Sequence, residues 1–208
     1  MYLVKSPWIL KKLYPSSLLW NMPRNDKTIY LTFDDGPISE VTPWVLETLK
    51  TYEAKGTFFC IGDNVRKHPG IYQQLLADGH ATGNHTFHHL NGWNTPDEEY
   101  LRDIQQCRDL VRSNLFRPPY GRIRKSQIGK LRQSDNSMRL VMWDVLSGDF
   151  DRSISPGKCL NNVLRHTENG SIVVFHDSLK AEDRLRYALP RALDAWKTKK
   201  FRIEKLIL

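Results

Sequence analysis

Two adjacent carboxylates, Asp34 and Asp35, stand where an apolar run ends, directly before the turn-forming dipeptide Gly36-Pro37. Successive side chains of an extended segment point in opposite directions, but a turn can bring both carboxylates toward one pocket. Two close carboxylates normally raise the pKa of one of them, and a nearby divalent cation removes that penalty. One carboxylate could then bind the metal while the other takes a proton from water. The alternative is a solvated turn that ends a strand.

Three imidazoles within five residues, His85, His88 and His89, offer metal ligands in a chain that has 7 histidines. Spacings of three and of four residues both place imidazoles on one side of a helical turn, so either His88 or His89 could join His85 at one ion. A mixed set of carboxylate and imidazole ligands with one open position is typical of a metal that activates water. These residues and the two carboxylates together predict a metal-dependent hydrolase.

Arg117 precedes Pro118-Pro119, and the prolines stiffen the turn on which the arginine stands. Its guanidinium could hold a carboxylate such as Asp34 bidentately and keep it ionised. The same turn could aim the N–H of Tyr120 at a substrate oxygen. A structural turn that carries a surface arginine is the alternative.

His176 follows the apolar run 172–175, which reads as a buried strand. A histidine at such a strand end is placed to act as a general acid if a carboxylate raises its pKa and fixes its tautomer. Asp149 is the first candidate for that carboxylate, with Asp144 and Asp177 as alternatives. A histidine with a purely structural role at a strand end is the other interpretation.

After residue 27, apolar runs of strand length alternate with amphipathic segments of helix length. We expect strands at 28–33, 57–61, 81–84, 115–117, 140–145, 171–175 and 201–206. We expect helices at 42–52, 70–78, 97–112, 125–133, 155–167 and 183–197. The dipeptides Thr42-Pro43 and Thr95-Pro96 would each supply a polar cap and a proline at a helix start.

This alternation predicts an α/β fold in which parallel strands are joined by helical crossovers. About seven strands suit a distorted (β/α) barrel better than a regular eight-fold one. The polar clusters described above all follow the carboxyl ends of predicted strands. Because those ends share one face of a barrel, five separate segments would converge there.

A length of 208 residues, with 40% hydrophobic and 26% charged residues, indicates one globular domain rather than a disordered or fibrous chain. We expect an N-terminal extension, residues 1–27, packed on a catalytic domain, residues 28–208. Trp8, Ile9, Leu13 and Leu18 would cover an end or a flank of that domain. Lysines and prolines interrupt the extension, so it predicts neither a transmembrane helix nor a cleavable signal peptide. Cytoplasmic and membrane- or wall-associated locations both stay open, as does the oligomeric state.

The formal charge of +8 favours anionic partners, among them acidic glycans, wall polymers, nucleic acid and lipid headgroups. The positive residues are dispersed, and no recognition helix or run of stacking aromatics accompanies them. We therefore expect no nucleic-acid partner. A nucleic-acid-binding protein would instead show steeply salt-dependent binding to DNA or RNA.

Over about residues 28–207 the chain resembles the NodB-type polysaccharide deacetylases, carbohydrate esterase family four. The run Thr32-Phe33-Asp34-Asp35-Gly36 resembles the first motif of the family, in which the first aspartate is the catalytic base and the second binds the metal. The run His85-Thr86-Phe87-His88-His89 resembles the second motif. By this resemblance Asp34 is the base, and Asp35, His85 and His89 are the metal ligands.

Arg117-Pro118-Pro119-Tyr120 resembles the third motif, in which the arginine orients the base and the tyrosine N–H helps to hold the oxyanion. The fifth motif places a histidine at His176, with Val174 where the family usually has leucine. The fourth motif departs further. Asp149, which would tune the acid, is present, but Leu146 replaces an acidic residue and Phe150 replaces a tryptophan.

The resemblance implies a hydrolase that removes acetyl groups from an N-acetylated polysaccharide, either peptidoglycan or a chitin-like polymer of N-acetylglucosamine. The expected metal would be zinc, and cobalt, nickel and iron would be the alternatives. Asp34 would act as base and His176, oriented by Asp149, as acid. Two alternatives stay open, an esterase that acts on O-acetylated xylan and a homologue that binds carbohydrate without turnover.

Overall fold

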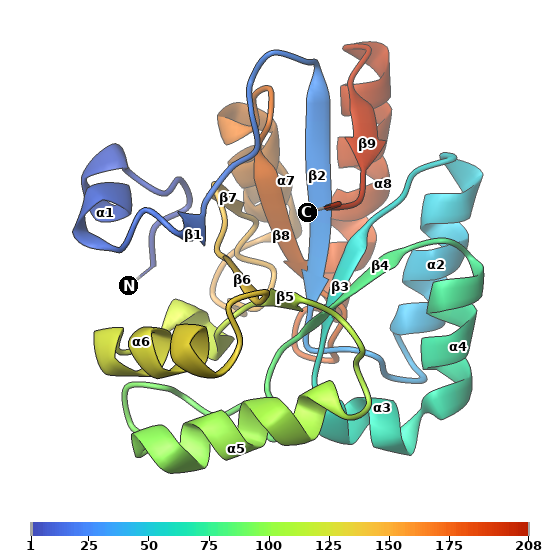
Figure 1. Ribbon diagram of the computed structural model, residues 1–208. Coiled ribbons are helices and arrows are strands. Elements are labelled where there is room, and N and C mark those ends of the chain that lie inside the picture. The colour runs from blue at the N-terminus through green and yellow to red at the C-terminus, as the bar shows by residue number, and fades with distance from the viewer. Residues whose placement is uncertain (1, 208) are drawn as a thin grey trace.

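The structure is a computed structural model that describes residues 2–207, and its centre is one parallel sheet that curls into an incomplete barrel (Figure 1). The strands are β1 (Leu18–Leu19), β2 (Thr28–Asp34), β3 (Thr57–Cys60), β4 (Ala81–Asn84), β5 (Leu115–Phe116), β6 (Arg139–Val141), β7 (Val145–Leu146), β8 (Ile172–His176) and β9 (Arg202–Glu204). Eight of them follow the order β1-β6-β5-β4-β3-β2-β8-β7, and β9 pairs with β2. The predicted α/β fold, a distorted (β/α) barrel, is confirmed.

Helices surround this sheet on its outer side (Figure 1). They are α1 (Trp8–Leu13), α2 (Thr42–Thr51), α3 (Gly62–Lys67), α4 (Pro69–Ala77), α5 (Asp97–Arg108), α6 (Lys125–Ser134), α7 (Pro156–His166) and α8 (Glu182–Thr198), with a 3₁₀ turn η1 (Pro119–Gly121). No helix within residues 2–207 has the length and apolar character that a membrane crossing requires.

The expected elements agree with the observed ones apart from short pieces. Each predicted strand coincides with a strand of the sheet, but the run 140–145 is divided into β6 and β7 because the chain changes neighbours there. β6 pairs with β5 and β1, whereas β7 pairs with β8. The two-residue β1 and the short helices α1 and α3 were not expected. They are too short to show a hydrophobic period.

The expected threonine caps are wrong in their chemistry, although both helices start where predicted. Val41 and Pro96 are the N-cap residues of α2 and α5, and neither makes a side-chain cap. The hydroxyl of Thr42 instead donates to the buried Asp177 carboxylate at 2.6 Å. The hydroxyl of Thr95 donates to the Asn91 carbonyl at 2.8 Å.

The core explains why β2 and β8 read as continuous apolar runs. Helices or packed side chains cover both faces of these strands, so residues of either parity are buried. Leu31, Phe33, Val173 and Phe175 have no exposed surface. The rings of Phe33 and Phe58 stack with centroids 4.8 Å apart. This packing fixes the strand ends that carry the polar residues.

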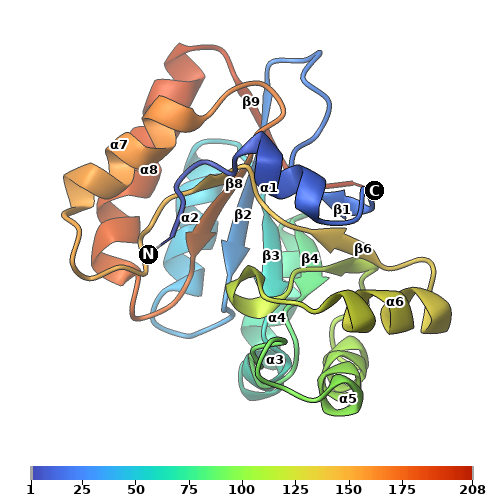
Figure 2. The ribbon, with the colours of Figure 1, turned by 90° about the vertical axis from the view of Figure 1, so that its left-hand side faces the viewer.

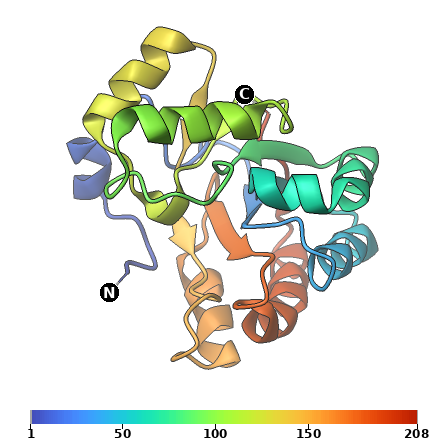
Figure 3. The same cartoon turned by 90° about the horizontal axis from the view of Figure 1, so that it is seen from below.

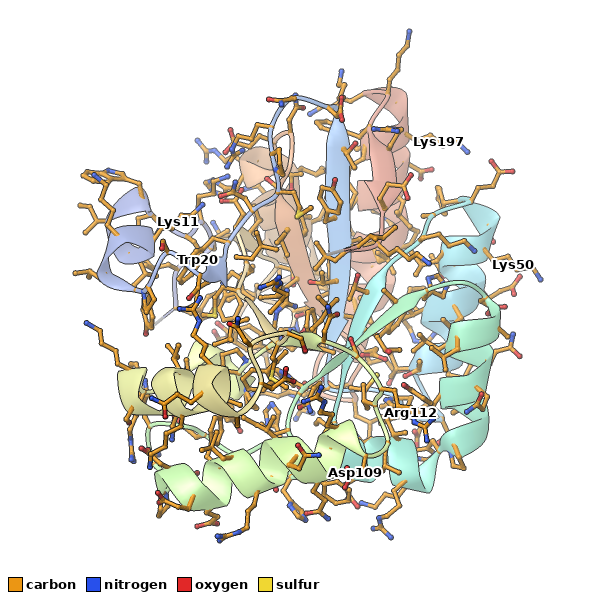
Figure 4. All side chains as sticks on the ribbon, viewed as in Figure 1. Lys11, Trp20, Lys50, Asp109, Arg112 and Lys197 are labelled. Atoms are coloured by element: carbon orange, nitrogen blue, oxygen red, sulfur yellow. The ribbon has the colours of Figure 1, made fainter. Side chains whose placement is uncertain are left out.

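The N-terminal segment lies against the open side of the barrel (Figure 2). There Leu146 donates its N–H to Val4 and Met142 donates its N–H to Leu19, so the segment fills the space between β6 and β7. The fully buried carboxylate of Asp144 binds Lys5 at 2.8 Å and Lys11 at 3.0 Å. Figure 4 labels Lys11 on α1.

The expectation that four apolar residues of this segment cover the domain is wrong for three of them. Leu18 is buried, and Trp20 beside it is buried too (Figure 4). Trp8, Ile9 and Leu13 are 64%, 56% and 64% exposed because α1 projects from the sheet (Figure 1). Strand pairing, the Asp144 ion pairs and the burial of Leu18 and Trp20 therefore attach the segment. From α1 itself, Leu10 packs against the core.

Candidate active site

The carboxyl end of β2 presents the two adjacent carboxylates. Asp34 is its last residue and is 4% exposed, and Asp35 follows in the left-handed region with φ 86°. The buried Asp177 supports this turn, because its carboxylate accepts the Gly36 N–H at 3.1 Å. Burial raises the pKa of Asp177 to about 8. Burial lowers the pKa of His85, and both carboxylates lie close enough to oppose that shift, so the turn brings them toward one pocket, as the sequence predicted.

Arg117 holds Asp34 from the opposite side of the barrel. The guanidinium has no exposed surface and donates to Asp34 Oδ1 at 2.6 Å. Burial lowers the pKa of Arg117, and the charge of Asp34 opposes that shift.

The expected bidentate pair between Arg117 and Asp34 is wrong. The remaining donors of the guanidinium bind the Thr32 hydroxyl at 2.9 Å and the carbonyls of Val141 and Met142 at 3.2 and 2.9 Å. One planar group thus ties the Asp34 side chain to backbone atoms of the β6 region.

Asp35, His85 and His89 form one cluster of possible metal ligands. One ligand atom from each lies within 4.8 Å of the others. The Asp35 carboxylate is 3.3 Å from His89 Nε2 and 3.8 Å from His85 Nε2. Burial alone would raise the pKa of Asp35, but the hydrogen bond with His89 and the nearby imidazoles lower it. One carboxylate and two imidazoles make a donor set that suits a divalent transition metal.

The backbone around His85 orients its imidazole. His85 Nδ1 lies 2.7 Å from the Arg117 carbonyl, so this nitrogen is the donor and Nε2 faces Asp35. Burial lowers the pKa of His85 to about 4, which keeps the imidazole neutral at pH 7. A neutral imidazole is the form that binds a metal.

The structure places His89, and not His88, beside Asp35. His88 points away, with Nδ1 2.5 Å from the Asp103 carboxylate. The spacing of these histidines predicts a helical turn at residues 85–89, and this prediction is wrong. Residues 85–89 form a loop in which Thr86 and His89 have φ values of 62° and 57°.

Asp103 is a functional candidate that sequence reasoning missed. It is buried on α5, and its Oδ2 accepts the N–H groups of Phe87 and His88 at 2.8 and 2.9 Å. Asp103 thereby fixes the loop that carries His85 and His89, the two imidazoles of the ligand cluster. A signal was present, because Asp103 falls on the same helix face as the buried Tyr100 and Cys107.

His176 ends β8 and pairs with Asp149. The imidazole Nδ1 of His176 lies 2.7 Å from Asp149 Oδ1, and the backbone N–H of His176 donates to Asp149 Oδ2 at 2.7 Å. Burial opposes the charged form, but Asp149 raises the pKa of His176 to about 9. The alternative partners are occupied elsewhere, Asp144 by lysines and Asp177 by the β2 turn.

Phe150 forms the outer wall beside this pair. Its ring meets His176 edge to face at 5.1 Å, and the ring of Tyr2 meets Phe150 at 5.0 Å. The Tyr2 hydroxyl donates to Asp151 at 3.0 Å. The N-terminal segment thus supports the wall at the position where Phe150 replaces the tryptophan of the fourth motif.

Tyr120 lies next to the metal-ligand cluster, in η1. Its φ of 60° is unusual for a residue with a side chain, and its ring centroid is 4.6 Å from that of His89. Within residues 2–207 no protein acceptor takes the Tyr120 N–H. A free N–H on a stiff turn is available to a substrate oxygen.

All the site residues predicted from the sequence lie at or after the carboxyl ends of strands, and Figure 3 views the sheet from the end where β2 and β8 finish. The ligand cluster lies near both pairs, because Asp35 follows Asp34 directly in the chain and, against the effect of burial, both carboxylates act with Asp149 to raise the pKa of His176. Such an arrangement can hold a cation and a reacting carbonyl between a base and an acid.

Comparisons with known proteins agree on one family. A family model described as polysaccharide deacetylase matches residues 21–138. The chain is similar to a peptidoglycan-N-acetylglucosamine deacetylase of Bacillus cereus, with 34% identity over 200 residues that cover 92% of each chain. It is similar to a chitooligosaccharide deacetylase of Azorhizobium caulinodans, with 35% identity over 77% of this chain and 78% of that one.

A solved structure shows the same fold. The crystal structure of the Bc1960 peptidoglycan N-acetylglucosamine deacetylase, in complex with 4-naphthalen-1-yl-N-oxidanyl-benzamide, superposes with a TM-score of 0.87. The two chains are 30% identical, and the match covers 96% of this chain and 94% of the other.

Proposed function

The chain belongs to the polysaccharide deacetylase family, enzymes that hydrolyse N-acetyl amide bonds, and we propose that it removes acetyl groups from N-acetylglucosamine units in a metal-dependent reaction. Residues 28–208 would be the catalytic domain, with residues 1–27 as an extension packed on it. The observation that carries the proposal is the register of β2 and β8, which puts Asp34 and His176 at paired positions beside the ligand cluster.

Asp35, His85 and His89 would hold the metal. The donor set of one carboxylate and two imidazoles suits zinc best, and it also suits cobalt, nickel or iron. When bound, a divalent metal supplies a Lewis acid for the acetyl carbonyl and increases the acidity of water.

Asp34 would act as the general base. Its carboxylate has one oxygen fixed by Arg117, which leaves the other to accept a proton from the attacking water. The same hydrogen bond from Arg117 holds the carboxylate in one orientation. The N–H of Tyr120 would donate to the oxygen that becomes negative as the carbonyl is attacked.

His176 would act as the general acid. With a pKa of about 9 the imidazole carries a proton at neutral pH, and Asp149 fixes Nδ1, so Nε2 is the nitrogen that can give the proton away. The nitrogen of the breaking amide bond takes this proton. The products are acetate and a free amine on the sugar.

Acetylated polysaccharide as the substrate class follows from the family, and N-acetylglucosamine as the unit is supported by the two named relatives. The test is acetate release from N-acetylglucosamine oligomers, peptidoglycan and acetylated xylan by metal-stripped protein with and without zinc. We expect metal-dependent release from the first two. Release from xylan alone would show an esterase instead.

Two variants test the residue roles in the same assay. Asp34→Asn and His176→Ala should each lower kcat by about 10²–10⁴-fold. His166→Ala is the matched control, because this histidine stands at the end of α7 and takes no part in the site. Equal activity of Asp34→Asn and wild type would contradict the assignment of the base.

A further inference from the structure

We propose, on the basis of the proposed function, that Trp93 and Arg122 form a neighbouring subsite that binds a carboxylate carried by the glycan next to the sugar being deacetylated. The two residues stand beside Tyr120, at the edge of the ligand cluster. Neither belongs to the motifs that place the chain in its family.

The first step is position. The ring of Tyr120 packs against that of His89, at 4.6 Å between centroids. Arg122 is two residues further along the chain, so its Cα is at most about 7.6 Å from that of Tyr120. The backbone N–H of Arg122 donates to the Pro119 carbonyl at 3.1 Å, so η1 holds Arg122 beside Tyr120.

The second step is the attachment of Trp93 to the same place. Its indole N–H donates to the Ile123 carbonyl at 3.4 Å, and its own carbonyl accepts from Arg124 at 2.7 Å. A side chain at Gly92 would lie 2.5 Å from the Arg122 carbonyl, which shows how closely the two loops approach. The loop before α5 and the turn after η1 are thus held as one surface.

The third step is the free chemistry of this surface. The Arg122 guanidinium stands over the Trp93 ring at 5.1 Å. Stacking through its face leaves its N–H donors free in the plane, and within residues 2–207 it makes no side-chain hydrogen bond or ion pair. Arg124, in contrast, is paired with Asp97 at 3.3 Å.

The fourth step is exposure. Trp93 is 51% exposed and Tyr120 is 60% exposed, so two aromatic surfaces and one unpaired cation face solvent next to the site. Apolar faces of sugar rings can pack on the aromatic surfaces. A guanidinium held flat is suited to a carboxylate, which it can bind through two parallel hydrogen bonds. A neutral polymer would leave this group unused.

The carboxylate has two possible sources on a wall glycan. One is the lactyl group of a neighbouring muramic acid unit, and the other is an acidic residue of a peptide attached to that unit. Both present the same chemistry to Arg122. The probes are therefore a neutral N-acetylglucosamine tetramer, peptide-free glycan strands with free lactyl carboxylates, and strands that keep their peptides.

The experiment compares kcat/KM for acetate release on the three probes by wild type and Arg122→Gln. We expect Arg122→Gln to lose roughly tenfold more on one of the acidic probes than on the neutral tetramer, chiefly through KM. The acidic probe that shows the larger loss identifies the source. Arg132→Gln removes the same charge from the exposed face of α6 and should leave the preference as in wild type.

Equal losses on neutral and acidic probes, or no loss on any probe, would overturn the subsite. Inactivity of wild type on every probe would instead contradict the proposed function. Equilibrium binding of the probes to Asp34→Asn, with and without Arg122→Gln, then decides the subsite independently of turnover. Equal affinity of both proteins for the acidic strands would overturn it.

Discussion

Asp34 and His176 are paired residues on the neighbouring parallel strands β2 and β8. Each is fixed by its own partner, Asp34 by Arg117 at 2.6 Å and His176 by Asp149 at 2.7 Å. The proposed base and the proposed acid are therefore held on two adjacent strand ends, next to a cluster that can bind a metal. Rigid strands limit the motion of both groups, which the transfer of two protons in one reaction requires.

The Asp149 partner should set the alkaline limit of activity. His176 has a pKa of about 9, so it donates a proton below that pH, and activity should fall as pH rises through about 9. Asp149→Asn removes the negative charge that raises this pKa, and the alkaline limb should move to lower pH. The measurement is the pH profile of kcat/KM. An alkaline limb at the same pH in both proteins would contradict the role of Asp149.

Arg117→Lys should reduce both activity and stability. A lysine ammonium cannot serve the Asp34 carboxylate, the Thr32 hydroxyl and two carbonyls at once. We expect the free energy of unfolding to fall by about 3 kcal/mol, and kcat to fall by about 10²-fold. Urea unfolding and single-turnover kinetics measure the two effects. A variant with wild-type kcat would show that Arg117 does not orient the base.

Asp103→Asn should weaken metal binding although Asp103 does not touch the ligand atoms. The amide has one acceptor oxygen, whereas the carboxylate serves two N–H groups and the His88 imidazole. We expect the affinity for zinc to fall by roughly 10–100-fold, measured by competition with a chelator. Glu99→Gln, an exposed change on the same helix, is the control. Unchanged zinc affinity in Asp103→Asn would remove this role.

Much of the fold can be predicted from the sequence, because strands that are buried on both faces of the sheet consist of continuous apolar residues. The apolar runs that became β2 and β8 and the polar residues at their ends belong to this pattern. The contacts of Asp103 and Asp177 do not, because they join segments 16 and 141 residues apart in the chain. Hydrophobic periodicity within one segment cannot predict a contact between two distant segments. The choice between His88 and His89 likewise depends on left-handed backbone at Thr86 and His89.

Tyr2 should affect catalysis from the far end of the chain. Its ring supports Phe150, which packs on His176, and its hydroxyl binds Asp151. Tyr2→Phe keeps the ring and should lower the free energy of unfolding by only about 1 kcal/mol. Tyr2→Ala removes the support as well and should lower kcat several-fold more than Tyr2→Phe does. Identical kcat values for the two variants would show that Phe150 holds its place without Tyr2.

The most direct test of the metal-dependent deacetylation is the stoichiometry of the reaction. Metal-stripped protein would be titrated with zinc in the presence of an N-acetylglucosamine tetramer, and acetate and free amine would be measured together. The proposed site predicts equal amounts of the two products, a rate that rises with zinc until one ion is bound, and no rise in Asp35→Ala. Acetate release that is independent of metal, or that leaves no free amine, would contradict it.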